Sequence, residues 1–215
     1  MKNQNDLYQY EVDVKKRGYR YIAGVDEVGR GPLAAGVLAC ACILNLDLEP
    51  IPGINDSKKL SEKKRQALSL EIKDKAIDYA YGYCNEKEID ELNIYEASKL
   101  AMIRAIKALK HQPDYLLIDA MNLDMDIPQL ALVKGDALSA SIGAASILAK
   151  VKRDEIMRLF HLQYPQYGFD KHKGYPTKYH LEQLEKYQPC PIHRNTFKPV
   201  YQARMTQIKL NLEVD

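Results

Sequence analysis

Short apolar runs that end in a charged residue constrain the fold of this chain most. Residues 115–118 (Tyr-Leu-Leu-Ile) end in Asp119, and residues 130–133 (Leu-Ala-Leu-Val) are followed by Lys-Gly-Asp at 134–136. Runs that are apolar throughout and only four residues long are typical of strands buried on both faces of a sheet. The two runs therefore predict buried strands whose last residues emerge at the edge of a sheet.

The rest of the chain predicts an α/β domain with a mixed sheet covered by helices. Residues 21–25 and 36–44 are apolar runs joined by a short connection rich in Gly and Pro, which suits a hairpin. Residues 77–83 alternate large residues with smaller or polar ones, as in a third strand. Apolar spacing becomes helical over 94–109 and in the Ala-rich stretch 139–160. Strands joined early and linked by helices later favour this architecture.

A chain of 215 residues is long enough for one well-packed unit. We predict a core over residues 1–160 and a C-terminal helical region over 161–215 that packs on it, in a protein that is a monomer. With 46% hydrophobic and 28% charged residues, the composition is that of a globular protein. No apolar run reaches the length of a membrane span, and the polar N-terminus lacks the apolar core of a secretory signal. We therefore expect a cytoplasmic protein without a membrane partner.

Cysteine and charge distribution add two expectations. The four cysteines, Cys40, Cys42, Cys84 and Cys190, form no C-x-x-C pattern, so that buried free thiols are favoured over a metal site. Residues 150–178 hold seven Lys/Arg against three acids, although the formal net charge of the chain is only +2. This segment is a candidate phosphate-facing surface, with an ordinary solvated surface as the alternative.

Four acids follow predicted strands: Asp26, Glu27, Asp119 and Asp136. Because functional side chains converge at strand ends in open α/β sheets, separate strands can bring these acids together. Clustered carboxylates repel one another unless a divalent cation lies among them. Oxygen ligands without Cys or His favour Mg²⁺ or Mn²⁺, and two such ions about four ångströms apart can support phosphoryl transfer.

Each acid also has a simpler interpretation. Acids after strands are commonly turn formers or helix caps, and any one of the four taken alone fits that description better. Asp154 and Glu155 lie on the predicted helix over 139–160. Asp154 comes 18 residues after Asp136. Asp154 is either a further metal ligand or part of an exposed helical face.

The sequence resembles the ribonuclease HII family over residues 20–200. The opening motif, Gly-Val-Asp-Glu-Val-Gly-Arg-Gly-Pro-Leu-Ala, is long and specific. The matching segments are 24–34, 55–61 (Asn-Asp-Ser-Lys-Lys-Leu-Ser), 88–90, 93–94, 118–119, 134–136, 144–151, 153–154, 174–177 (Gly-Tyr-Pro-Thr), 193–194 (His-Arg) and Phe197. Ala120 and Thr196 stand where many members have glycine and serine. The related ribonuclease HIII has an additional N-terminal domain, whereas about 20 residues precede the first motif here.

The resemblance implies a ribonuclease H-like fold with a five-stranded mixed sheet flanked by helices. It assigns the four acids to metal binding and the segment Gly29-Arg30-Gly31 to the 2′-hydroxyl of the ribonucleotide. Lys58 is a further substrate-binding candidate. Tyr175 matches the tyrosine that stacks on the deoxyribose after the ribonucleotide, and an exposed tyrosine near lysines suits that task. The C-terminal helical region would thus bind substrate.

The implied activity is that of an endoribonuclease. It hydrolyses the RNA strand of RNA–DNA hybrids and cuts 5′ of single ribonucleotides in duplex DNA, using two Mg²⁺ or Mn²⁺ ions and leaving 5′-phosphate and 3′-hydroxyl ends. A carboxylate-metal nuclease acting on DNA and a catalytically silent hybrid-binding module remain the alternatives. Residues 207–212 (Gln-Ile-Lys-Leu-Asn-Leu) weakly resemble a sliding-clamp-binding peptide, for which a frayed tail is the simpler explanation.

Overall fold

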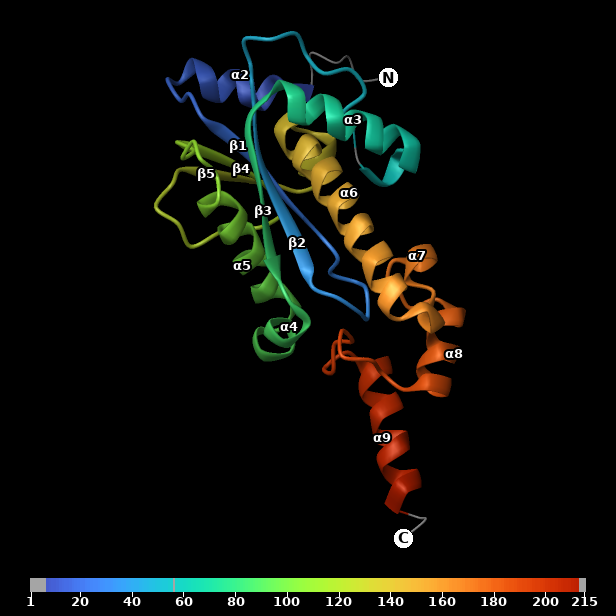
Figure 1. The fold of residues 1–215 in the computed structure, drawn as a ribbon. Coiled ribbons are helices and arrows are strands. Elements are labelled where there is room, and N and C mark those ends of the chain that lie inside the picture. The colour runs from blue at the N-terminus through green and yellow to red at the C-terminus, as the bar shows by residue number, and fades with distance from the viewer. Residues whose placement is uncertain (1–6, 56, 213–215) are drawn as a thin grey trace. The chain divides into compact units, whose positions relative to one another are not determined.

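The computed structural model describes residues 7–55 and 57–212, with side chains described as far as residue 206. Figure 1 shows the order of the elements along the chain. They are α2 (Gln9–Lys16), β1 (Ile22–Val28), β2 (Val37–Leu44), η1 (Ser57–Lys59), α3 (Glu62–Lys75), β3 (Ala76–Cys84), α4 (Glu86–Leu92), α5 (Ile94–Lys107), β4 (Tyr115–Asp119), β5 (Gln129–Leu132), η2 (Gly135–Ala137), α6 (Ala140–Gln163), η3 (Pro165–Tyr167), α7 (Phe169–His172), α8 (Lys178–Tyr187) and α9 (Lys198–Leu212).

The five strands form one mixed sheet in the order β3-β2-β1-β4-β5. β1 and β2 pair antiparallel as the predicted hairpin, whereas β4 pairs parallel with both β1 and β5. β2 is buried along its whole length, and its eight residues are all apolar. A strand that is apolar on both faces is stable only where other elements cover it. This agrees with the position of β2 between β3 and β1. The predicted α/β class and mixed sheet are confirmed.

The chain divides into two compact units, each made of three segments. The first unit comprises residues 1–28, 38–83 and 98–152, and the second comprises 29–37, 84–97 and the segment from 153 onward. The predicted boundary divides the chain only once, near residue 160. That division stays a prediction.

In the first unit, α5 covers one face of the sheet, while α3 and the beginning of α6 cover the other (Figure 1). Two glycines allow helices to approach the strands closely. A Cβ on Gly24 would lie 2.0 Å from the backbone carbon of Ser141, and one on Gly82 would lie 2.0 Å from the carbonyl oxygen of Ala101. Because no side chain fits in that space, the sequence requires glycine at both positions.

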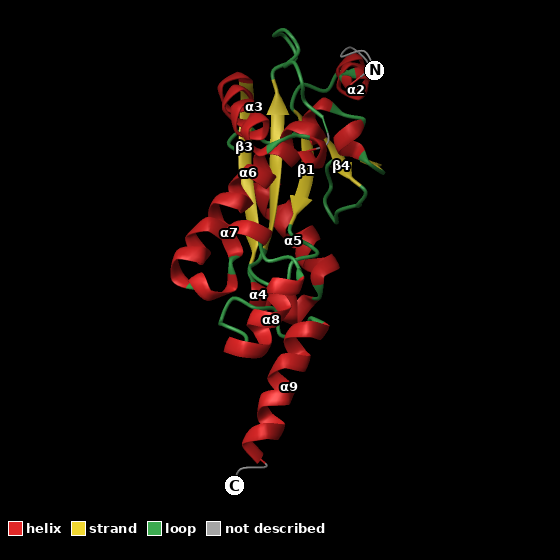
Figure 2. Cartoon of the chain, turned by 90° about the vertical axis from the view of Figure 1, so that its right-hand side faces the viewer, coloured by secondary structure: helices red, strands yellow, loops and turns green. Residues whose placement is uncertain are grey.

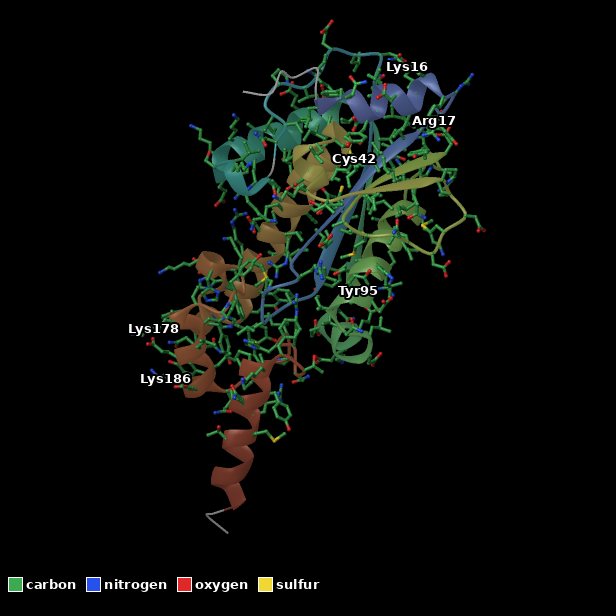
Figure 3. The ribbon with its side chains drawn as sticks, turned by 180° about the vertical axis from the view of Figure 1, so that it is seen from behind. Lys16, Arg17, Cys42, Tyr95, Lys178 and Lys186 are labelled. Atoms are coloured by element: carbon green, nitrogen blue, oxygen red, sulfur yellow. The ribbon has the colours of Figure 1, made fainter. Side chains whose placement is uncertain are left out.

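The second unit is built mainly of helices and loops after residue 165 (Figure 2). Lys178 and Lys186 project outward from α8 (Figure 3). Inside, buried side chains from the segment 29–37 and from the segment after residue 153 share one apolar cluster. Its buried members are Leu33, Ala34, Ala35, Met157, Tyr167, Phe169, Leu184, Cys190, Ile192, Val200 and Ala203.

Several expectations can be compared directly with the structure. All four cysteines are free and buried, as predicted; Cys42, on β2, is labelled in Figure 3. Asp26 and Glu27 lie within β1, which continues to Val28, so the prediction that they follow the strand is wrong. No helix in the part of the chain that the structure describes is both long and apolar enough to cross a bilayer. The side chains of the predicted clamp-binding segment, residues 207–212, lie outside the described part.

Candidate active site

Three of the predicted acids lie together at one end of the parallel pair β1–β4. The last paired residues of these strands are Val25 and Ile118, and Asp26 and Asp119 come directly after them. Asp26, Glu27 and Asp119 each offer a carboxylate oxygen, and these three atoms lie within 4.8 Å of one another. Because the parallel pairing of β1 and β4 ends at Val25 and Ile118, the residues that follow them become neighbours although more than ninety positions separate them.

The surroundings of the Asp26 carboxyl group disfavour its ionised form. Its side chain is almost fully buried, with 6% of the residue exposed. Burial raises the pKa of Asp26 well above its ordinary value, and the negative charges of Glu27, Asp119 and Asp136 raise it further, whereas a hydrogen bond with Ser146 lowers it. The ionised cluster is therefore unfavourable unless a positive charge compensates it.

Asp119 and Asp136 are linked through the turn η2. The Asp119 Oδ1 atom accepts a hydrogen bond of 2.7 Å from the backbone N–H of Gly135. A Cβ at position 135 would lie 3.2 Å from this same oxygen and 2.7 Å from Ile142 Cδ1. Glycine therefore lets the turn approach the carboxylate. Asp136, the next residue, is 9% exposed and lies outside the group of three, although its charge acts on Asp26.

The donor set fits a divalent cation. The group consists of carboxylate oxygens, without thiol or imidazole. Such ligands suit hard divalent ions of the Mg²⁺ and Mn²⁺ type, and a divalent charge relieves the repulsion that raises the pKa of Asp26. Asp26, Glu27 and Asp119 are the residues that would hold it, and Asp136 is a further acid whose charge acts on Asp26.

In the second unit, Arg194 holds the loop that contains Gly29-Arg30-Gly31. Arg194 is fully buried. Its guanidinium group donates to the carbonyl oxygens of Ala35 at 2.7 Å, Arg30 at 3.0 Å, Gly29 at 2.6 Å and Gly36 at 3.2 Å. A single guanidinium group thus provides hydrogen bonds to four carbonyl oxygens of one loop and fixes the backbone of that loop.

Gly29 has a structural reason to be glycine. Its φ is +101°, and a Cβ there would lie 2.3 Å from Arg153 Nε. Arg153 is itself buried, and its guanidinium donates to the carbonyl oxygens of Lys173 at 3.0 Å and Ala34 at 3.3 Å. The side chain of Arg153 thereby connects the loop around residues 29–36 with the loop that precedes Tyr175.

Tyr175 lies against Gly31 and is accessible to solvent. It is 42% exposed, and a Cβ on Gly31 would lie 3.3 Å from its ring carbon Cε1. A backbone hydrogen bond of 2.8 Å from Leu33 to Gly174 joins the same two loops. The two segments assigned to ribose and deoxyribose recognition therefore form one continuous surface of the second unit.

The remaining predicted residues have mixed outcomes. Lys58 is exposed in η1, and its role in substrate binding stays a prediction. Asp154 is 3% exposed, so the interpretation as an exposed helical face is wrong for this residue; its role as a ligand stays a prediction. Arg153 is 1% exposed, and the predicted phosphate-facing surface over 150–178 therefore loses one of its cations. Glu155 is exposed.

Three residues of the site carry roles that sequence reasoning did not assign. Ser146 hydrogen-bonds Asp26 and lies 2.9 Å from the hydroxyl of Ser57, while Arg153 and Arg194 fix the loops of the second unit. All of them fall in the segments that carry the family resemblance. Their location in these segments was the one sequence feature that could have identified them, because their contact partners are distant along the chain.

Comparison with known proteins agrees with this geometry. The family model of ribonuclease HII matches residues 23–200. Ribonuclease HII of Bacillus licheniformis is 55% identical over 194 residues, which cover 90% of this chain and 76% of that relative. The crystal structure of ribonuclease H2 from Pyrococcus horikoshii superposes with a TM-score of 0.76 at 27% identity, covering 87% of this chain and 98% of that one.

A more distant structural neighbour shares the fold. Bst-RNase HIII in complex with Mn²⁺ has a TM-score of 0.67 at 16% identity and covers 86% of this chain and 70% of its own. The predicted ribonuclease H-like fold is thus confirmed by its neighbours, and the predicted family by a match over most of the chain. The chain belongs to the ribonuclease HII family and is a ribonuclease H, a hydrolase that acts on RNA–DNA hybrids.

Proposed function

We propose that this chain cuts the RNA strand of hybrids and also cuts 5′ of single ribonucleotides embedded in duplex DNA. Two Mg²⁺ or Mn²⁺ ions serve the reaction, and Asp26, Glu27, Asp119 and Asp136 hold them. The products carry 5′-phosphate and 3′-hydroxyl ends. The observation that carries the proposal is the group formed by the buried Asp26 and the partly exposed Glu27 and Asp119, with carboxylate oxygens within 4.8 Å of one another.

The chemistry follows from what these residues can do. When bound, the ions activate a water molecule and stabilise the departing 3′ oxygen. Asp26 and Asp119 are fixed by adjacent strands, and the Gly135 N–H orients Asp119 further. The carboxylates themselves remain ionised ligands, so no side chain acts as a nucleophile. The 2′-hydroxyl is recognised and does not attack, which is consistent with 3′-hydroxyl products.

Substrate recognition is assigned to the surface formed by Gly31 and Tyr175. The exposed Tyr175 ring presents an apolar face suited to stacking on a sugar, and the adjacent backbone of 29–31 presents polar groups within a loop that Arg194 fixes. A rigid loop next to an exposed ring can distinguish a ribose followed by a deoxyribose from either sugar alone. This arrangement supports recognition of an RNA-to-DNA junction.

The metal part of the proposal is tested by Asp26→Asn. We expect the variant to bind a 5′-labelled duplex containing one ribonucleotide but to cut it at least about a thousandfold more slowly in Mg²⁺ or Mn²⁺, because the ligand charge is lost. Asp74→Asn, at an exposed position on α3, is the matched control and should cut normally. Cleavage by Asp26→Asn at the wild-type rate would refute the assignment.

The junction part is tested by Tyr175→Ala beside Tyr175→Phe, which keeps the ring. The alanine variant should lose most cleavage at a single ribonucleotide, roughly 5- to 150-fold for a lost stacking contact of about 1–3 kcal/mol, while the phenylalanine variant should retain it. An all-DNA duplex should remain uncut by either protein. An unchanged rate for Tyr175→Ala, or efficient cutting of the all-DNA duplex, would contradict the proposal.

A further inference from the structure

Two buried histidines connect the segment 190–193 to the main chain of Tyr175. His193 Nδ1 lies 3.0 Å from the backbone nitrogen and 3.1 Å from the thiol of Cys190. His193 Nε2 lies 3.1 Å from His180 Nε2, and His180 Nδ1 lies 2.9 Å from the carbonyl oxygen of Tyr175. Neither imidazole is exposed to solvent. The contacts thus run without interruption from Cys190 to Tyr175.

The contacts at the two ends of this series of hydrogen bonds, Cys190 and Tyr175, determine which ring nitrogens carry a proton. A carbonyl oxygen only accepts, so His180 Nδ1 carries a hydrogen and donates to Tyr175. In a neutral His180 the Nε2 atom is then an acceptor, which requires His193 Nε2 to carry a hydrogen. His193 Nδ1 is left as an acceptor for the N–H and S–H groups of Cys190. The carbonyl oxygen of Cys190, 3.3 Å from Nδ1, accepts instead from the backbone N–H of His193 at 3.0 Å. Every group is satisfied with both rings neutral.

Burial keeps both rings in this neutral form. It lowers the pKa of His180 to about 4, and burial together with the charge of His180 lowers the pKa of His193 to about 3. The neighbouring His172, whose ring stacks on His180 with centroids 4.5 Å apart, also has a lowered pKa because of burial. Near neutral pH each group in the series from Cys190 to His180 therefore donates a hydrogen bond to the next group, and the last acceptor is the carbonyl oxygen of Tyr175.

The residue after His193 reaches the other recognition loop. Arg194 binds the carbonyl oxygens of Gly29 and Arg30, and its backbone N–H donates to Leu33 at 2.9 Å. His193 itself forms a β-bridge with Ala34. Two consecutive residues thus hold the two segments of the recognition surface, one through a guanidinium group and the other through His180.

We propose that His193 and His180 are positioning residues that set the place of Tyr175 relative to the loop 29–31, and thereby the preference for an RNA-to-DNA junction. The inference rests on the proposed role of Tyr175. The histidines act through the carbonyl group of Tyr175. A displaced Tyr175 ring would weaken cleavage at a single ribonucleotide more than cleavage inside a long hybrid, where no junction is present.

A pair of substitutions separates this role from simple packing. His193→Asn keeps an acceptor near Cys190 but removes the donor to His180, whereas His193→Gln places an amide N–H near the position of Nε2. We expect His193→Asn to lower kcat/KM on the single ribonucleotide roughly 10- to 100-fold and on a long hybrid far less. His193→Gln should restore most of the loss. His111→Asn, at a largely exposed histidine, is the control.

A double-mutant cycle with Tyr175→Ala distinguishes the possible failures. If the histidines act through Tyr175, adding His193→Asn to Tyr175→Ala should cost less than about twofold on the single ribonucleotide. Independent, multiplying losses would refute this inference and leave the proposed function intact. An unaffected Tyr175→Ala protein would refute the junction role itself, and this inference with it.

A measurement on the unaltered protein remains decisive if the variants fail to fold. In ¹⁵N-histidine-labelled protein at pH 7, His180 should carry its proton on Nδ1 and His193 on Nε2, two tautomers that nitrogen shifts distinguish. Backbone-based resonance assignment of the unaltered protein identifies the two rings. Observation of the opposite tautomer in either ring, or of a charged ring, would overturn the proposed chain.

Discussion

Lowering the pH from 8 to 5 is expected to destabilise the protein through His180 and His193. Both have ordinary pKa values of 6.5, which burial lowers to about 4 and about 3 in the folded protein. A histidine with a lowered folded pKa contributes stability that is fully present above pH 6.5. That contribution is lost as the pH falls from 6.5 toward the folded value, because the unfolded chain takes up a proton that the folded protein excludes.

The size of the effect at pH 5 depends little on the folded pKa values. Both lie below 5, so each ring remains neutral in the folded protein. In the unfolded chain each ring is protonated, at a pH 1.5 below its ordinary pKa, and 1.5 times 1.36 kcal/mol gives about 2 kcal/mol per histidine. The two histidines together should therefore reduce the free energy of unfolding by about 4 kcal/mol.

Urea unfolding at pH 8 and pH 5 measures this loss, and His193→Gln isolates one half of it. Glutamine does not titrate, so the loss of stability between the two pH values should be about 2 kcal/mol smaller than in wild type. Asp26, whose pKa is raised, acts in the opposite direction but equally in both proteins. His111→Gln should behave as wild type. Equal losses in wild type and His193→Gln would refute the reasoning.

Three further predictions concern close contacts. Gly24→Ala should lower the free energy of unfolding by about 3 kcal/mol, since its Cβ would overlap the backbone at the start of α6; unchanged urea unfolding would contradict this. Arg194→Met should cost about 3–5 kcal/mol by leaving four carbonyl groups without their donor, as thermal unfolding would show. Asp90→Asn should cost about 1–2 kcal/mol, because hydrogen bonds from Asn195 and Thr196 outweigh partial burial and lower the pKa of Asp90. If the free energy of unfolding fell equally with decreasing pH in wild type and Asp90→Asn, the stabilising role of the ionised Asp90 would be refuted.

Most strands and helices were predictable because their patterns are local. The prediction of a buried strand over 130–133 is wrong, because β5 lies at the edge of the sheet and Val133 is 74% exposed. The β4 run ends in Asp119 as expected, and the Ala-rich stretch forms α6. The end of β1 was not predictable in this way. Its pairing with β2 continues to Val28 and Leu38, so the strand passes through two acids that a local pattern treats as its end. Pairing partners, and not composition, decide where this strand stops.

The acids of the site were predictable because strand ends bring them together, whereas the residues that fix the recognition loops were not. Arg153 counts as a surface cation in any sum of charges along the sequence. Its burial depends on the carbonyl oxygen of Ala34, 119 residues away. A buried arginine of this kind is recognisable only when the loops it joins are already placed. The same holds for Arg194.

The sequence separation of these contacts has a consequence for biosynthesis. Arg194 bonds to Gly29, which leaves the ribosome 165 residues earlier. At 5–20 residues per second, the loop spends roughly 8 to 33 seconds without the side chain that fixes it. The second unit therefore cannot assemble until residue 194 has been synthesised, while β1 and β2 can already pair. A nascent chain released before residue 194 would carry most of the sheet but an unorganised recognition loop.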